Sequence, residues 1–200
     1  MKNLIKFGLP LAMSLIGLSA HANAITGTVR MAGQVTFDTQ SLATATAASF
    51  TNPAAIVTSG TGSYAGVPTG VSSPGVNFNN FSFASTGPNV VPSLWSFVYN
   101  GWTYSFSLAD ITSVTRTDST DLSIKGDGAV NIAGAGSPYT VTSASWSFDV
   151  TDTSGGNSGS FVFGFSQSDT AVPDGGNAAI LLGVAIAGLI AFGKFRKATA

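Results

Sequence analysis

The stretch Trp102-Thr-Tyr-Ser-Phe-Ser-Leu108 decides the fold class, because apolar and hydroxyl side chains alternate along it without a break. Successive side chains of a β-strand point to opposite faces, so this pattern predicts a strand with one apolar and one hydroxyl face. Asn100-Gly101 lies between this stretch and the apolar run Leu94–Tyr99, and it is the strongest short signal for a two-residue hairpin turn. We therefore expect two antiparallel strands joined at this turn.

The same alternation recurs along the chain, and no segment of the body has the period of an amphipathic helix. These features predict an all-β body over residues 25–171, folded as an antiparallel β-sandwich or a jelly-roll-like domain. The aromatic residues are expected to face the core, although a platform for stacking carbohydrate would use the same residue types. The expected further strands are Ile25–Phe37 with a bend at Gly33, Val76–Ala84, Ile111–Arg116, Asp121–Lys125, Ala129–Ala133, Ala144–Val150 and Phe161–Phe165.

Two segments of the first half fit no regular strand. Ser41–Phe50 is ambiguous between a strand and a short helix, and Thr58–Gly75 is a long Gly-, Ser- and Pro-rich loop. Loops of that length are usually either mobile or functional.

The charges of the body are few and mostly negative. Three basic residues stand against eight aspartates over residues 25–171, which leaves an excess of five negative charges and argues against nucleic acid as a partner. The chain has no cysteine, so no disulfide stabilises it.

The residue types of the body offer little catalytic chemistry. His21, the one histidine, lies in a predicted signal peptide, so the mature chain has neither the histidine nor the cysteine that common nucleophilic triads and zinc sites need. No spacing singles out a pair of aspartates for acid–base work. Asp118–Asp121, Gly126–Gly128 and Asp149–Asn157 have the oxygen donors that calcium prefers, but aspartate is also a common turn residue. We expect no enzyme, no cofactor and no metal site.

Residues 1–24 have the three parts of a secretory signal peptide. A short basic segment, Met1–Lys6, precedes the apolar run Phe7–Leu18, and small residues follow it. Cleavage by signal peptidase is expected after Ala22 or after Ala24, with Ala24 preferred; the alternative is a retained signal helix that serves as an anchor.

The C-terminal end has its own three-part organisation. A short motif, Val172-Pro173-Asp174-Gly175-Gly176, is followed by a segment over residues 177–193 whose central fifteen residues, Ala178–Phe192, are uncharged and apolar. A helix of fifteen residues spans roughly 22 Å, and snorkelling of flanking basic side chains makes a thin transmembrane helix feasible. Residues 194–200 form a basic tail, expected in the cytoplasm, with Lys194, Arg196 and Lys197 at the membrane boundary. The alternative is a buried core helix or a tail helix packed on the body.

This tail resembles the C-terminal sorting signal of the PEP-CTERM class of exported bacterial proteins, in its VPDSG-type variant. Gly175 stands where that variant commonly has serine. The resemblance covers about the last 29 residues, and it implies recognition and cleavage near the short motif by an exosortase, a membrane-embedded processing enzyme. It implies sorting and no activity.

Two functions are compatible with these observations. The first is a non-catalytic exported protein of the cell envelope or extracellular matrix, sorted through its tail and held transiently in the inner membrane. The alternative is a surface-displayed module that binds extracellular polysaccharide through the loop Thr58–Gly75 or through exposed aromatics such as Trp95 or Trp102.

Overall fold

The computed structural model describes residues 22–117, 120–152 and 161–169 of the chain. These residues form β-strands and two short 3-10 helices, η1 (Gly62–Tyr64) and η2 (Gly70–Ser72). The strands are β1 (Asn23–Ala24), β2 (Gly27–Phe37), β3 (Ala47–Ser49), β4 (Ala55–Gly60), β5 (Gly75–Phe78), β6 (Phe81–Ser82), β7 (Gly87–Tyr99), β8 (Trp102–Arg116), β9 (Asp121–Ala133), β10 (Tyr139–Thr140), β11 (Thr142–Thr151) and β12 (Phe161–Asp169).

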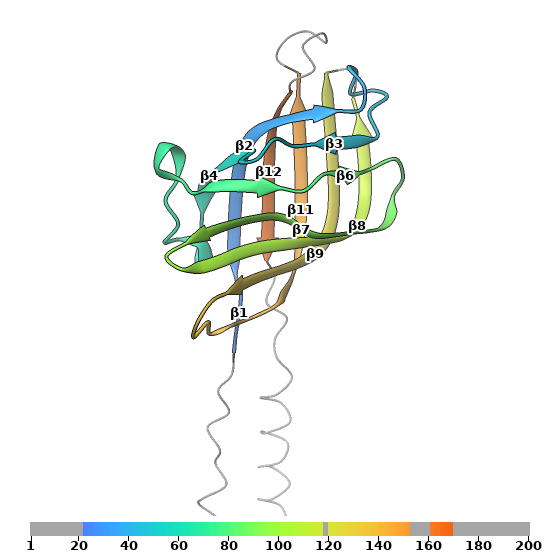
Figure 1. Cartoon of the computed structure of the whole chain (residues 1–200). Coiled ribbons are helices and arrows are strands. Elements are labelled where there is room, and N and C mark those ends of the chain that lie inside the picture. The colour runs from blue at the N-terminus through green and yellow to red at the C-terminus, as the bar shows by residue number, and fades with distance from the viewer. Residues whose placement is uncertain (1–21, 118–119, 153–160, 170–200) are drawn as a thin grey trace, which may run out of the picture.

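Eight of these strands form one closed antiparallel barrel. Neighbouring strands follow the order β2, β4, β5, β7, β8, β9, β11 and β12, and β12 then pairs with β2 over Phe161–Asp169. The prediction of an all-β antiparallel body is confirmed, but the predicted sandwich or jelly-roll-like domain is wrong, because both need two separate sheets with free edges. Here the first and last long strands pair with each other, which removes those edges. Figure 1 shows β11 and β12 running at a steep angle behind β7 and β8.

Several predicted strands are joined into longer ones. Asp121–Lys125 and Ala129–Ala133 are parts of β9, which continues through the Gly126-Asp127-Gly128 segment that we expected to be a turn. An ideal Cβ at Gly126 would lie 2.0 Å from the carbonyl oxygen of Asp110, and one at Gly128 would lie 2.4 Å from the Phe106 ring. Glycine is present here because neighbouring groups approach the strand closely, and not because the chain turns.

The hairpin predicted at Asn100-Gly101 is confirmed. Both residues have positive φ, 51° and 76°, as a type I′ turn requires, and Tyr99 pairs with Trp102 across the turn. The strand before the turn is longer than expected, because β7 begins at Gly87 and includes two prolines, Pro88 and Pro92. They are tolerated there because β5 pairs with β7 only around Trp95, so one edge of the early part of β7 has no barrel partner.

The two segments of the first half are also ordered. Ser41–Phe50 forms no helix; it contains a turn and then β3, which pairs with β2 and with β6. The expected loop Thr58–Gly75 includes the end of β4, both 3-10 helices and the first residue of β5.

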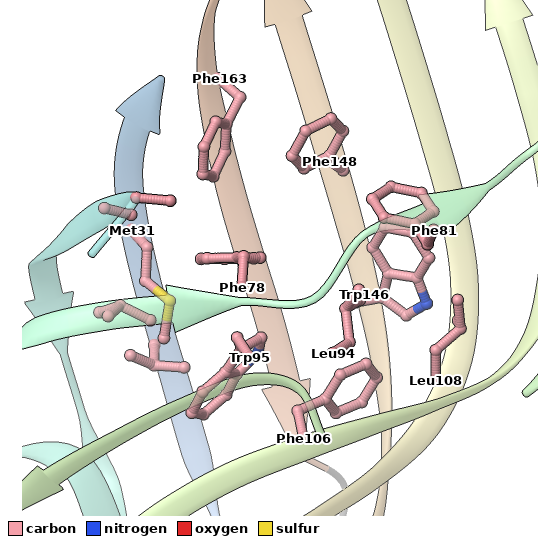
Figure 2. Close-up of a cluster of buried hydrophobic side chains, with 14 of the residues drawn as sticks. Met31, Phe78, Phe81, Leu94, Trp95, Phe106, Leu108, Trp146, Phe148 and Phe163 are labelled. Carbon is pink, nitrogen blue, oxygen red and sulfur yellow. The ribbon is translucent and has the colours of Figure 1, made fainter. Parts of the chain in front are cut away.

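The barrel interior is filled mainly with aromatic and aliphatic side chains, as the alternation predicted. Tyr104, Phe106 and Leu108 of β8 are buried, whereas Trp102 is half-buried at the end of the strand. Figure 2 shows rings from β11 and β12 facing side chains from β5, β7 and β8 across the interior. The centroids of Phe148 and Phe163 are 4.8 Å apart, and Phe163 meets Phe78 edge-on at 5.2 Å. Contacts of this kind add about 0.5–1.5 kcal/mol per pair to the burial of the rings.

Candidate functional site

The two ends of the described body meet at one end of the barrel, which we call the terminal pole. We define it by Asn23, Tyr64, Trp102, Tyr139 and Asp169. Asp169, the last residue of β12, pairs with Gly27 at the start of β2, and Asn23 of β1 pairs with Tyr139 of β10. The β7–β8 turn reaches the same end, because the ring centroids of Trp102 and Tyr139 are 5.9 Å apart. In Figure 1 this pole is at the lower end of the barrel, near β1.

Tyr64 closes the interior at this pole. Gly62 of η1 and Gly27 of β2 both have positive φ, 57° and 118°. An ideal Cβ on either glycine would lie 2.2–2.3 Å from a carbonyl oxygen of the other segment, at Thr26 or Thr61. Only glycine permits this close approach, which places η1 against the start of β2. As a result Tyr64 enters the barrel and is fully buried.

A buried polar cluster surrounds the Tyr64 hydroxyl. The hydroxyl donates to Asp169 Oδ2 at 2.8 Å, and Gln167 Nε2 donates to the Tyr64 oxygen at 3.0 Å and to Asp169 Oδ1 at 2.6 Å. Gln167 is fully buried, and Asp169 is 8% exposed. The Gln167 Oε1 atom has no hydrogen-bond partner among the described residues. Tyr64 is therefore connected inside the barrel to two side chains of β12 that are more than a hundred residues away in sequence.

Burial determines the ionisation of this cluster. It raises the pKa of the Asp169 carboxyl above its ordinary value, and the hydrogen bonds donated by Gln167 and Tyr64 oppose that shift. Burial and the nearby Asp169 carboxylate also raise the pKa of the Tyr64 hydroxyl far above its ordinary value. A substrate in solution has little access to these groups. The arrangement is therefore suited to fastening the loop and the last strand together, and not to acid–base catalysis.

The sequence predicted a strand over Phe161–Phe165, but β12 continues to Asp169, and neither its last four residues nor this cluster was predicted. Gln167 and Asp169 are an even number of residues after Phe163, so all three side chains lie on the face of β12 that points to the interior. A polar side chain at an inward position of an alternating strand is the signal that could have indicated the cluster. Nothing in the sequence around Tyr64 indicated that it enters the barrel.

Half-buried aromatic residues surround the outside of the terminal pole. Trp102 and Tyr139 meet edge-on, with an angle of 73° between the rings. Tyr104 stacks on Phe97 at 4.7 Å. Burial raises the pKa of the Tyr104 hydroxyl, and the nearby hydroxyls of Tyr139 and Tyr99 raise it further. Tyr104 itself is buried, so the pole presents the indole of Trp102 and the phenols of Tyr99 and Tyr139, and Trp102 and Tyr139 do not form a flat stacking surface.

The aromatic residues expected to bind glycan differ in their exposure to solvent. Trp95 is fully buried, so the expectation that it is an exposed binding residue is wrong: its strand turns that position toward the core. Trp102 remains accessible in part at the pole. Tyr64, the aromatic residue of the loop Thr58–Gly75, is buried in the interior and so is not available to bind glycan.

A shallow groove lies on the side of the barrel, between β2 and the segment that connects β3 with β4. Its volume is about 480 Å³, and its lining includes Gln34, Thr36, Ser49, Thr51 and Ile56. The size suits a small ligand. The polar side chains that line it are spread along the groove, and none of them is a buried group left without a partner.

Of the aspartates considered for calcium, Asp121, Asp127 and Asp149 lie in strands of the barrel wall, Asp152 follows β11, and Asp118 lies outside the described residues. Asp127 is inside β9, and Asp149 in β11 accepts hydrogen bonds from Ser123 at 2.6 Å and from Ser147 at 3.2 Å. Asp121 accepts from Thr151. Over the described ranges, no three potential ligands of the histidine, cysteine, aspartate or glutamate type come together.

Most of the predicted sorting residues lie outside the described residues. This applies to the motif Val172–Gly176, to the segment 177–193, to Lys194, Arg196 and Lys197, and to residues 1–21 of the signal peptide. Of the two predicted cleavage positions, Ala22 is exposed and Ala24 belongs to β1. Cleavage after Ala22 would keep β1, whereas cleavage after Ala24 would remove it.

Comparisons with known proteins return no relative. No protein-family model, no curated protein and no solved structure matches this chain. In the part of the chain that the structure describes, no helix has the length and apolar character needed to cross a membrane.

Proposed function

We propose that this chain is a non-catalytic exported protein of the cell envelope or extracellular matrix, sorted through its C-terminal segment. The observation that carries the proposal is the order of motif, apolar segment and basic tail over residues 172–200. The geometry of the body is compatible with it. Two residues separate Asp169 at the terminal pole from Val172 of the motif, so a tail inserted in the membrane would hold the barrel by this one end.

The chemistry of the body supports a non-catalytic role. The described aspartates lie in strands and loops where several accept hydrogen bonds from neighbouring hydroxyls, and Asp169 is enclosed in the barrel. Residues after His21 include neither histidine nor cysteine. The proposed partners are signal peptidase, an exosortase-like enzyme and the membrane through the C-terminal helix, followed by extracellular polysaccharide.

Mass spectrometry of the protein from cells tests this proposal. Membrane and released fractions are kept apart, and the intact mass and the C-terminal peptide are measured in each. The proposal expects mature chains that end within or next to Val172–Gly176. Persistence of a peptide containing Ile180–Phe192 in all mature protein would contradict processing and leave an ordinary membrane anchor.

A second candidate is a glycan-binding module, favoured by the partial exposure of Trp102 beside Tyr139 at the terminal pole. Aromatic rings of this kind can stack on sugars. A polysaccharide pull-down with residues 23–171 tests it, with Trp102→Ala as the variant that should lose binding. Equal retention of the variant and the parent protein would exclude this site.

A further inference from the structure

The outer surface of the terminal pole is uncharged, as is the whole stretch of residues 39–109 to which part of it belongs. The three segments that form its outer surface, residues 61–64, 98–103 and 133–142, contain no charged residue. Among the residues by which the pole is defined, the charged side chain is that of Asp169, which is enclosed with Tyr64 and Gln167. At the opposite end, by contrast, lie Asp38, Arg116 and Asp121, next to the ends of β2, β8 and β9.

Apolar side chains project from this uncharged surface. Val98, just before the β7–β8 turn, and Val141, between β10 and β11, are each 63% exposed. Half-buried Trp102 and Tyr139 contact each other at the same pole. An exposed pair of valines next to an indole and a phenol gives a surface that is apolar and able to form hydrogen bonds at its margin.

The aromatic residue types are also divided between the two ends. All four tyrosines of the chain, Tyr64, Tyr99, Tyr104 and Tyr139, lie at or next to the terminal pole. The opposite end is lined by phenylalanines, namely Phe37, Phe50, Phe81, Phe83 and Phe148. Tyr64 and Tyr104 are buried, whereas Tyr99, Tyr139 and Trp102 are partly exposed. Tyrosine and tryptophan are the aromatic residues that favour the boundary between lipid and water, because each has an apolar ring and a polar group.

We propose that the terminal pole lies against the lipid headgroups of the membrane that holds the apolar segment Ala178–Phe192. This inference rests on the proposed function, which places that segment in the membrane. Eight residues separate Asp169 from Ala178, so the pole is within about 30 Å of the start of the segment. Asp38 and Asp121 at the opposite end of the barrel disfavour contact of that end with anionic lipid. The pole combines this short connection with the partly exposed Trp102 and Tyr139, and it is therefore the end of the barrel that faces the bilayer.

Site-specific fluorescent probes test this orientation, because the chain has no cysteine of its own. Val98→Cys carries an environment-sensitive fluorophore at the pole. Val90→Cys is the matched control, because Val90 is also an exposed valine of β7, 75% exposed, and lies eight residues nearer the opposite end. Ala185→Cys reports insertion of the tail. Each full-length chain is reconstituted into vesicles of phosphatidylethanolamine and phosphatidylglycerol.

The proposal expects a blue-shifted probe at position 98 that is protected from iodide, and a probe at position 90 that iodide quenches. Brominated lipid should also quench the emission of Trp102 in the unlabelled chain, and Trp102→Phe should remove that quenching. An embedded probe at 185 with positions 98 and 90 equally quenched would overturn the orientation and leave the anchor intact. A quenched probe at 185 would overturn both proposals. If the probe at position 98 responds to soluble polysaccharide and not to vesicles, the partner of the pole is glycan and the lipid proposal is wrong.

Discussion

Replacing Tyr64 by phenylalanine removes one hydroxyl from the buried cluster and keeps the ring that closes the barrel. The Tyr64 hydroxyl donates to Asp169 at 2.8 Å and accepts from Gln167 at 3.0 Å. A hydrogen bond to a charged group contributes about 1.5–3 kcal/mol, and one to a neutral group about 0.5–1.5 kcal/mol. We expect Tyr64→Phe to lower the free energy of unfolding by about 1.5–3 kcal/mol when Asp169 is ionised.

The loss should depend on pH, because it depends on the charge of Asp169. The folded-state pKa of Asp169 is raised above its unfolded value, so the folded protein holds the extra proton between the two pKa values. The contribution of Asp169 to stability is therefore fully present below the unfolded pKa, near 3.9, and is lost as pH rises through the folded pKa. Tyr64→Phe removes a donor to the carboxylate, which raises that pKa further. The variant should thus lose more stability at pH 8 than at pH 4, by about 1 kcal/mol.

Thermal and urea unfolding of residues 23–171 at both pH values, followed by tryptophan emission, measures this effect. At pH 8 the midpoint temperature should fall by roughly 3–12 °C. Tyr104→Phe is the matched control, since Tyr104 also lies near the pole and its hydroxyl makes no hydrogen bond to the described residues. We expect a change within about 0.5 kcal/mol for the control. Equal losses in the two variants, or a loss for Tyr64→Phe that does not vary with pH, would refute the assigned role of the cluster.

Three further outcomes follow from the packing. Gly128→Ala should destabilise the fold by at least about 2 kcal/mol in urea unfolding, because the added Cβ would overlap neighbouring groups. Gly66→Ala is the control: nothing lies within 4 Å of the added Cβ, so this change should be neutral or slightly stabilising. Iodide should quench only the emission of Trp102 in residues 23–171, because the other two tryptophans are buried; quenching that survives Trp102→Phe would contradict this. Cleavage after Ala24, which the sequence favoured, would remove β1 and leave a charged amino group at the buried Ile25. We therefore expect N-terminal sequencing of mature protein to begin at Asn23, after cleavage behind Ala22; a start at Ile25 would show that β1 is dispensable.

Local sequence determined much of the barrel wall. Alternation over Trp102–Leu108 and Ala144–Val150 predicted strands and the faces of their side chains, and Asn100-Gly101 predicted the turn between β7 and β8. These predictions succeed because strand alternation and turn geometry depend on residues close together in the chain. The terminal signals were likewise recognised from local composition, and they remain predictions.

The tertiary structure decided whether the sheet closes and what its end contains. Alternation is the same in a sandwich and in a barrel; the difference is that β12 pairs with β2, more than a hundred residues earlier. The sequence suggested a turn at Gly128, but this glycine lies inside β9 because the Phe106 ring occupies the space that a side chain would need. Tyr64 and Asp169 are likewise brought together over 105 residues. Local periodicity does not specify such partners, because contacts between distant segments form only when the whole chain folds around one core.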